Sequence, residues 1–226
     1  MLNKIRTKLT LILIVVSLIP FITIGLITIN ISKEAMLNKT FAQLESVRDS
    51  KKHLIDLYFD RVKADIAVLA NNSRTGAALN GFSSTLNEGK IDKNRYDFFV
   101  SLEYGELFSI FCQEYEYNEV LLINKNGDIV YSLKEESYLA KNVLNAPLKN
   151  TNLGKYFKKG LESITMTDYE LYSLSGNQPT AFLFAPIKIL GKVEGTAVLK
   201  LSIDPLNKIM IGRSGMGKTG EAFSRF

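Results

Sequence analysis

The hydrophobic pattern begins with a long, uninterrupted apolar run near the N-terminus. Residues 9–32 contain no charged side chain. A helix of that length spans roughly 36 Å at ~1.5 Å per residue, which is enough to cross a bilayer core of about 30 Å. A cleaved signal peptide would have a shorter apolar region followed by a small-x-small cleavage pattern, and this sequence has neither. We therefore predict an uncleaved transmembrane helix over residues 9–32, with the lipid bilayer as its surroundings.

Basic residues in front of this run set its predicted orientation. Lys4, Arg6 and Lys8 precede the run, and no acidic residue does. By the positive-inside rule, residues 1–8 are expected in the cytoplasm and the rest of the chain outside it. The expected location is the cell membrane, with a single visible span.

A long amphipathic helix is predicted directly after the span. Residues 33–70 contain neither Gly nor Pro, and apolar residues recur mostly every three or four positions. The recurring apolar residues are Leu37, Phe41, Leu44, Val47, Leu54, Tyr58, Val62, Ile66 and Leu69. Residues 71–93 are rich in Asn, Ser, Gly and Thr, which predicts a loop with a short helix around residues 77–79. A second helical period over residues 96–112 predicts a helix that folds back, so residues 33–113 form a long helix and a return helix.

The period then changes to two, which indicates strands. Strands are predicted over residues 119–123 and 129–133, joined by a turn at Gly127, and over residues 166–172, 181–189 and 193–202. A helix is predicted over residues 150–163, with Thr151 as its N-cap. The expected fold class is α+β: a five-stranded, mainly antiparallel sheet with a long helix packed behind it. If the chain ends where its sequence does, residues 193–202 are expected at an exposed sheet edge.

The composition excludes several classes of protein. Hydrophobic residues make up 46% of the 226 positions, which is typical of a folded chain. One Cys (Cys112) and one His (His53) exclude an intrachain disulfide framework and Cys-rich or His-rich metal sites, so no metal and no cofactor is expected. Beyond the N-terminal trio, 25 basic residues nearly balance 23 acidic ones, so no nucleic-acid partner is expected.

Residues 212–219 match the phosphate-binding pattern G-x-x-x-x-G-K-[ST], with Lys218 and Thr219 in the lysine and hydroxyl positions. A P-loop needs a helix directly after it, and Gly220 is a poor start for one. The predicted sheet is antiparallel and the segment is expected outside the cytoplasm. A nucleotide hydrolase is therefore the less favoured alternative, which ATP binding would revive.

After the membrane span and the long helix, five motifs follow in a fixed order. They are EVLLINKNGDIVYSL, LKNTNLGKYFKKGLES, TDYELYSLSGNQPTAFLFAPI, GKVEGTAVLKLSID and GMGKTGE. This series resembles the extracytoplasmic Cache-type sensor region of bacterial methyl-accepting chemotaxis receptors and sensor kinases, over roughly residues 1–222. The resemblance implies a PAS-like sheet that closes over a small-molecule pocket. The residues that mark the amino-acid-binding Cache subfamily are not found, so that ligand class is not implied.

The sequence departs from this family at its end. Relatives usually continue into a second Cache module, a second span, a HAMP linker and cytoplasmic signalling helices, whereas this sequence stops at Phe226. Residues 114–205 are expected to form the sensor sheet, and residues 206–226 a truncated continuation.

Six residues are candidates for ligand contact: Tyr131, Asp168, Tyr172, Ser175, Phe182 and Phe184. In a regular strand over residues 166–172, Asp168 and Tyr172 share a face, and Phe182 and Phe184 share a face of the next strand. An aromatic pocket with a few polar groups is typical of small-molecule sites. Asp168 would bind an ammonium group, and the hydroxyls of Tyr172 and Ser175 would orient the ligand. In the plainer interpretation, the two Phe residues are core and Asp168 caps a turn or pairs with a Lys.

The leading functional hypothesis is an extracytoplasmic small-molecule sensor module of a transmembrane chemotaxis receptor. The alternatives are the sensor region of a histidine kinase or other membrane signalling protein, and a membrane-anchored binding protein without output. No constellation typical of catalysis is visible, so the chain is not expected to be an enzyme. The resemblance implies a homodimer with paired long helices, although the same apolar positions would also serve packing within one chain.

Overall fold

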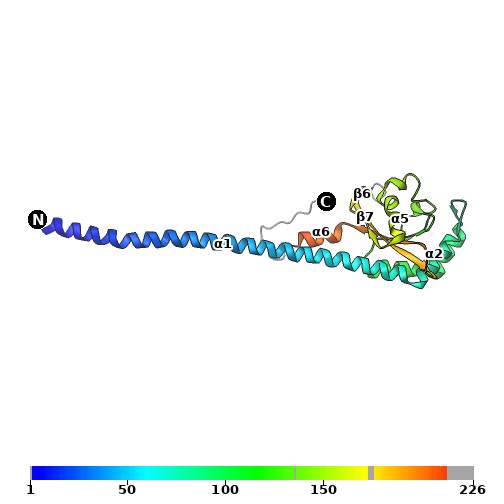
Figure 1. Ribbon diagram of the computed structural model, residues 1–226, viewed down its shortest axis with the longest axis horizontal. Coiled ribbons are helices and arrows are strands. Elements are labelled where there is room, and N and C mark those ends of the chain that lie inside the picture. Colours follow the sequence, from blue (N-terminus) through cyan, green and yellow to red (C-terminus); the bar gives the residue numbers. More distant parts are fainter. Residues whose placement is uncertain (1, 135, 173–175, 213–226) are drawn as a thin grey trace. The chain divides into compact units, whose positions relative to one another are not determined.

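The computed structural model describes residues 2–134, 136–172 and 176–212 (Figure 1). The described chain divides into two compact units. The first contains the residues up to His53 together with Gly212, and the second contains Leu54–Ile211.

Unit 1 consists mainly of the N-terminal part of helix α1 (Leu2–Asn71), which passes through Pro20 without a break. The described part of α1 contains a stretch long and apolar enough to cross a membrane, by length and composition. The structure therefore confirms that one helix includes both the apolar run and the amphipathic segment after it. Leu37, Phe41 and Leu44 are exposed on this part of the helix.

Unit 2 contains the last turns of α1 and all the other elements. Their bounds are α2 (Ser73–Ser83), β1 (Leu86–Asn87), β2 (Lys90–Ile91), α3 (Lys93–Phe98), the π-helix η1 (Phe99–Tyr104), α4 (Gly105–Glu114), β3 (Glu119–Asn124), β4 (Ile129–Ser132), the 3₁₀ turns η2 (Glu136–Tyr138) and η3 (Leu148–Asn150), α5 (Asn152–Glu162), β5 (Thr165–Met166), β6 (Glu170–Tyr172), β7 (Gln178–Ile189), β8 (Lys192–Ser202) and α6 (Asp204–Ile211).

The main sheet is antiparallel and, among the described residues, has six strands in the order β4-β3-β8-β7-β5, with β6 also paired to β7. This confirms the predicted α+β class with an antiparallel sheet. The predicted strand over residues 166–172 is wrong in detail, because it is split into β5 and β6. At the break, the Thr167 hydroxyl accepts the Phe182 N–H at 3.0 Å, a bond that a ladder carbonyl would otherwise make. The expected edge at residues 193–202 is also wrong, since β8 lies between β3 and β7.

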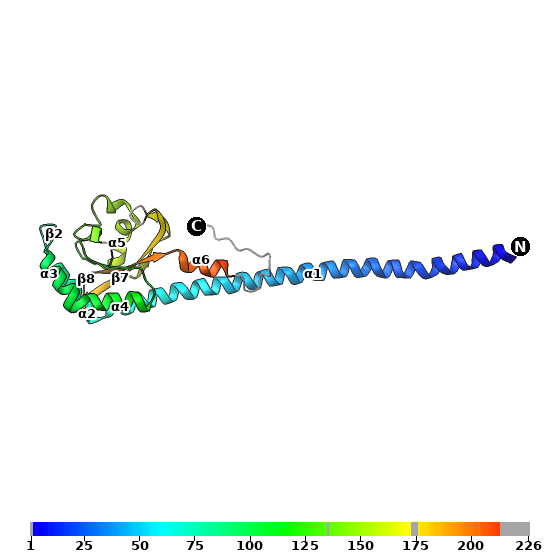
Figure 2. The same ribbon diagram turned by 180° about the vertical axis from the view of Figure 1, so that it is seen from behind.

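Alternation along the strands divides the interior of unit 2 into two cores, one on each face of the sheet. One core packs α1, α2 and α4 against residues such as Leu122, Leu183 and Leu199. The other packs α5 and the segment before it against Leu121, Phe182 and other residues of opposite parity. Figures 1 and 2 show α5 on one side of β7 and β8, with α2 and α4 on the other side.

The segment between α1 and β3 is more helical than expected. α2 has 11 residues and is longer than the predicted short helix around residues 77–79, and the Asn72 side chain caps it by accepting the Arg74 N–H at 2.9 Å. The predicted helix over residues 96–112 is three segments, α3, η1 and α4. The N–H of Gly105 donates to the Val100 carbonyl, the five-residue step of a π-helix. A side chain at Gly105 would collide with that carbonyl, so the glycine permits this junction.

Candidate ligand-binding site

A cavity of about 160 Å³ lies between the N-terminal end of α5 and strands β6 and β7. It is lined by residues from the start of α5 and the two strands, namely Asn150, Thr151, Asn152, Glu170, Leu171, Tyr172, Thr180 and Phe182. The cavity lies on the α5 face of the sheet, since Tyr172 and Phe182 belong to the core on that face.

The inner wall of this cavity is aromatic. Tyr172 and Phe182 are both almost fully buried, and their rings meet edge to face with centroids 5.1 Å apart. Beneath them α5 lies very close to β7, because a Cβ built on Gly160 would lie 2.6 Å from the Cβ of Phe184. The glycine allows this approach, which fixes the position of α5 over the sheet.

The rim of the cavity is polar. Asn152 is 5% exposed, and its side-chain amide donates to the Asp168 carbonyl at 3.2 Å, which ties α5 to the segment before β6. Thr151 stands at the predicted N-cap position, but its hydroxyl donates to the Leu148 carbonyl at 2.6 Å and does not cap α5. Glu170 is exposed and is the charged side chain among the lining residues. The rim thus combines a carboxylate with the partially positive N-terminus of an 11-residue helix.

The structure brings some of the predicted site residues together. Tyr172 and Phe182 line the cavity, and Phe184 lies in the same core but does not line it. Asp168 is exposed, and its backbone carbonyl, rather than its side chain, is the group bonded to Asn152. Ser175 lies outside the described residues.

Tyr131 is on the opposite face of the sheet from the other candidates. It is 1% exposed and stacks on Phe82 of α2 at 4.7 Å, inside the core formed by α1, α2 and α4. Burial raises the pKa of its hydroxyl far above the ordinary value, so the side chain stays protonated at neutral pH. The structure therefore does not place Tyr131 with Tyr172 and Phe182.

Sequence reasoning missed several residues that line the cavity, above all Asn152, Glu170 and Thr180. Two of them carried a usable signal. The alternation that pairs Asp168 with Tyr172 also passes through Glu170, and Asn152 belongs to one of the motifs that carried the family resemblance.

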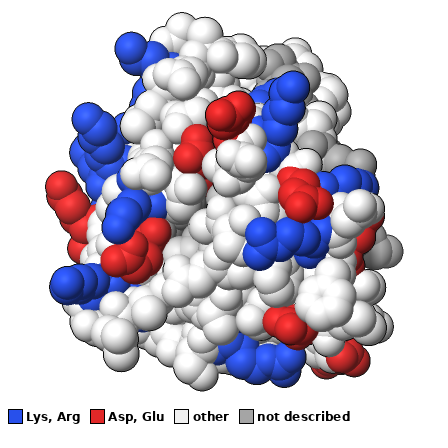
Figure 3. All heavy atoms as spheres, turned by 90° about the vertical axis from the view of Figure 1, so that its right-hand side faces the viewer, with Lys and Arg blue, Asp and Glu red and all other residues white. Residues whose placement is uncertain are grey.

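The remaining candidate groups from the sequence are possible metal ligands, Cys112 and the P-loop-like motif. No cluster of three or more His, Cys, Asp or Glu side chains with metal-binding geometry occurs among the described residues. Cys112 is 5% exposed, and burial together with the nearby Glu119 carboxylate raises the pKa of its thiol to about 12. Residues 213–219 of the P-loop-like motif lie outside the described residues. Basic and acidic side chains are interspersed on the face seen in Figure 3.

Comparison with known proteins locates this architecture among solved sensor domains. No family model and no curated protein sequence matches the chain. The sensor domain of the V. cholerae histidine kinase DctB matches 82% of the chain with a TM-score of 0.54 at 16% identity. The sensory domain of the Campylobacter jejuni chemoreceptor Tlp3, solved with isoleucine bound, matches 73% of the chain with a TM-score of 0.50 at 13% identity. The chain has the fold of these sensor domains.

This shared fold confirms the Cache-type architecture expected from the ordered motifs. The chain spans 61% of the DctB domain and 60% of the Tlp3 domain.

Proposed function

We propose that the chain is the extracytoplasmic small-molecule sensor module of a transmembrane signalling receptor. The observation that carries the proposal is the cavity between α5, β6 and β7, in a fold shared with solved sensor domains. An aromatic wall and a polar rim are what a site for a small polar molecule needs.

The rim suggests which ligand chemistry the cavity accepts. The Glu170 carboxylate would accept hydrogen bonds from an ammonium or hydroxyl group of the ligand. The partially positive N-terminal end of α5 would attract a ligand oxygen. Tyr172 and Phe182 would cover an apolar part. We therefore expect a small molecule that carries a hydrogen-bond donor and an acceptor on a short apolar body.

Ligand binding would reach α1 through the sheet. Val62, Ile66 and Leu69 of α1 are almost fully buried in the core on the sheet face opposite the cavity. A ligand that changes how α5 and β7 pack would alter the surface on which these three residues rest. The size of the response is limited by the difference in ligand affinity between the two states of the module.

For the output, we propose a chemotaxis receptor, supported by the ordered sequence motifs and by the fold shared with Tlp3. The second candidate is a histidine kinase sensor, which the fold shared with DctB supports. A strain without a chemotaxis receptor would lose its swimming response to the ligand. Loss of a kinase sensor would change transcription and leave swimming unaltered.

A homodimer in the bilayer is part of the proposal. Leu37, Phe41 and Leu44 recur at helical spacing and are exposed in the single chain. Pairing of two α1 helices would bury them. A Leu44→Cys variant, cross-linked in the membrane, is expected to give a dimer band through the introduced thiol. The native Cys112 is buried. A Lys39→Cys variant serves as the comparison on the same helix.

The test of the proposed function is a thermal-shift screen of the full chain in detergent micelles, with a panel of amino acids, amines, hydroxy acids and polyols. At least one probe is expected to raise the Tm of the wild type, and Glu170→Gln is expected to reduce this rise. Lys155→Gln, an exposed change on α5, is the matched control. The proposal fails if no probe raises the Tm, or if Glu170→Gln and Phe182→Leu leave every rise unchanged.

A further inference from the structure

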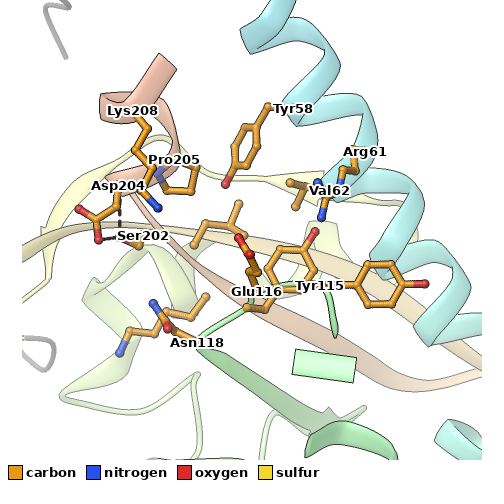
Figure 4. Close-up of a pocket in the computed structure, with 13 residues that line it drawn as sticks. Tyr58, Arg61, Val62, Tyr115, Glu116, Asn118, Ser202, Asp204, Pro205 and Lys208 are labelled. Atoms are coloured by element: carbon orange, nitrogen blue, oxygen red, sulfur yellow. Dashed lines mark hydrogen bonds between the residues drawn. The ribbon is translucent and has the colours of Figure 1, made fainter. Parts of the chain in front are cut away.

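A second cavity, of about 310 Å³, lies where α1, residues 115–118, the end of β8 and α6 meet (Figure 4). It is lined by Tyr58, Arg61, Val62, Tyr115, Glu116, Tyr117, Asn118, Lys200, Leu201, Ser202, Asp204, Pro205 and Lys208. None of these residues lines the cavity beside α5. They are therefore two separate cavities of unit 2.

One wall of the second cavity is a stack of aromatic rings. Phe111 and Tyr115 stack with centroids 4.8 Å apart, and the planes of Tyr115 and Tyr117 differ by only 8°. The Tyr117 hydroxyl donates to the Asp65 carboxylate at 2.7 Å, which anchors the stack to α1. Tyr115 at the outer end of the stack is 37% exposed. A planar group entering the cavity would therefore find a flat aromatic surface that is already in place.

Three basic and two acidic side chains line the cavity. Arg61 contacts Asp65 through Nε at 3.7 Å, and its side chain is 62% exposed. Lys208 is exposed and forms no ion pair with another described residue. The Asp204 carboxylate accepts the Ser202 hydroxyl at 2.8 Å and lies in the first turn of α6, where the helix dipole stabilises it. Arg61 and Lys208 are thus available to bind an anion.

Glu116 supplies an acceptor on another side of the cavity. Its φ is +60°, in the left-handed region that residues other than Gly rarely adopt, and such strain is often retained at binding sites. Figure 4 shows the Tyr58 side chain and the Glu116 carboxylate pointing into the cavity, from α1 and from the 115–118 segment respectively. Burial raises the pKa of the Tyr58 hydroxyl above its ordinary value of 10.0, so the group stays protonated well above pH 7.

We propose that this cavity is a second ligand site, for a small planar carboxylate that carries a hydroxyl group at its far end. The carboxylate binds Lys208, the ring lies on the tyrosine stack, and the hydroxyl donates to Glu116. The volume is at the low end of the range of about 300–1,000 Å³ for ligand pockets, which limits the ligand to a small molecule. Because Tyr58 and Arg61 belong to α1 and Lys208 to α6, an occupied site would link these two helices directly.

The experiment is isothermal titration calorimetry of the full chain in detergent micelles, corrected with empty micelles. The probe is 4-hydroxybenzoate. Benzoate lacks the hydroxyl group, and 4-hydroxybenzyl alcohol lacks the carboxylate. 4-Hydroxybenzoate is expected to bind about tenfold or more tightly than either, since a hydrogen bond to a charged group contributes ~1.5–3 kcal/mol.

Variants locate the binding in this cavity. Lys208→Gln is expected to weaken 4-hydroxybenzoate binding about tenfold, whereas Lys188→Gln, an exposed change on β7, is expected to have no effect. Glu116→Gln is expected to weaken 4-hydroxybenzoate and leave benzoate unchanged. Absence of binding at millimolar probe, or equal weakening by both Lys variants, would overturn the proposal. Loss of binding in Glu170→Gln would also overturn it, because the probe would then occupy the cavity beside α5.

Discussion

The close approach of α5 to β7 makes Gly160→Ala a sensitive test of the architecture around the first cavity. The added Cβ would lie 2.6 Å from the Cβ of Phe184 and 2.8 Å from two of its ring carbons. Ordinary contacts of this kind are about 3.5–4.0 Å, so α5 must move by about 1 Å. Overpacking of this type destabilises by about 1–3 kcal/mol, and the better helix propensity of Ala offsets about 0.5–1 kcal/mol.

The expected net loss is up to about 2.5 kcal/mol, which lowers the Tm of a domain of this size by up to roughly 10 °C. The assay is thermal unfolding of the full chain followed by circular dichroism. Lys158→Ala places the same new residue at an exposed position of the same helix, and its Tm should stay close to that of the wild type. A raised Tm in Gly160→Ala would refute the packing of α5 on Phe184.

Three further predictions concern the other elements of unit 2. Phe82 is fully buried and has four aromatic neighbours with ring centroids 4.7–6.1 Å away. Phe82→Ala is therefore expected to lower the free energy of unfolding, measured by chemical denaturation, by about 3–5 kcal/mol. Phe98 is 49% exposed, so Phe98→Ala is expected to lower it by about 1 kcal/mol or less. Equal losses in the two variants would contradict the aromatic core. Asn72→Ala removes the cap of α2 and is expected to lower the free energy of unfolding by about 1 kcal/mol. Asn118 is exposed and caps no helix, so Asn118→Ala should change this free energy little. A larger loss in Asn118→Ala than in Asn72→Ala would refute the cap. The Cys112 thiol has its pKa raised from 9.0 to about 12 by burial, so the unfolded state loses this proton at lower pH than the folded state. The contribution of the thiol to stability is complete below pH 9 and is lost as the pH rises from 9 toward 12. Cys112→Ala should therefore flatten the plot of unfolding free energy against pH between pH 9 and 12. An identical plot for the variant and the wild type would contradict the burial of the thiol.

The elements that periodicity predicts well are those in which one face is buried. The hairpin of β3 and β4 and the pair β7 and β8 follow the expected ranges, because alternating residues enter opposite cores. Phe182 and Phe184 share a face as expected for the same reason. The long helix also follows from its apolar spacing and from the lack of Gly and Pro over residues 33–70.

The elements that sequence reasoning missed depend on single side-chain bonds. The strand over residues 166–172 is interrupted because a Thr167 hydroxyl replaces a ladder bond, and no periodic pattern encodes that event. The break turns Asp168 outward and leaves Glu170 to line the cavity beside Tyr172. Tyr131 is a candidate from the sequence because it lies on the predicted hairpin, whereas the irregular register between β3 and β4 turns it toward α2.

The central claim is that the cavity beside α5 binds a small molecule. Its most direct test is hydrogen–deuterium exchange of the full chain, with and without the probe that gives the largest Tm rise in the screen. Slower exchange is expected in wild-type peptides that cover residues 150–156, 170–172 and 176–182, and no such change is expected in Glu170→Gln. Slower exchange confined to other elements, or no change at saturating probe, would contradict it.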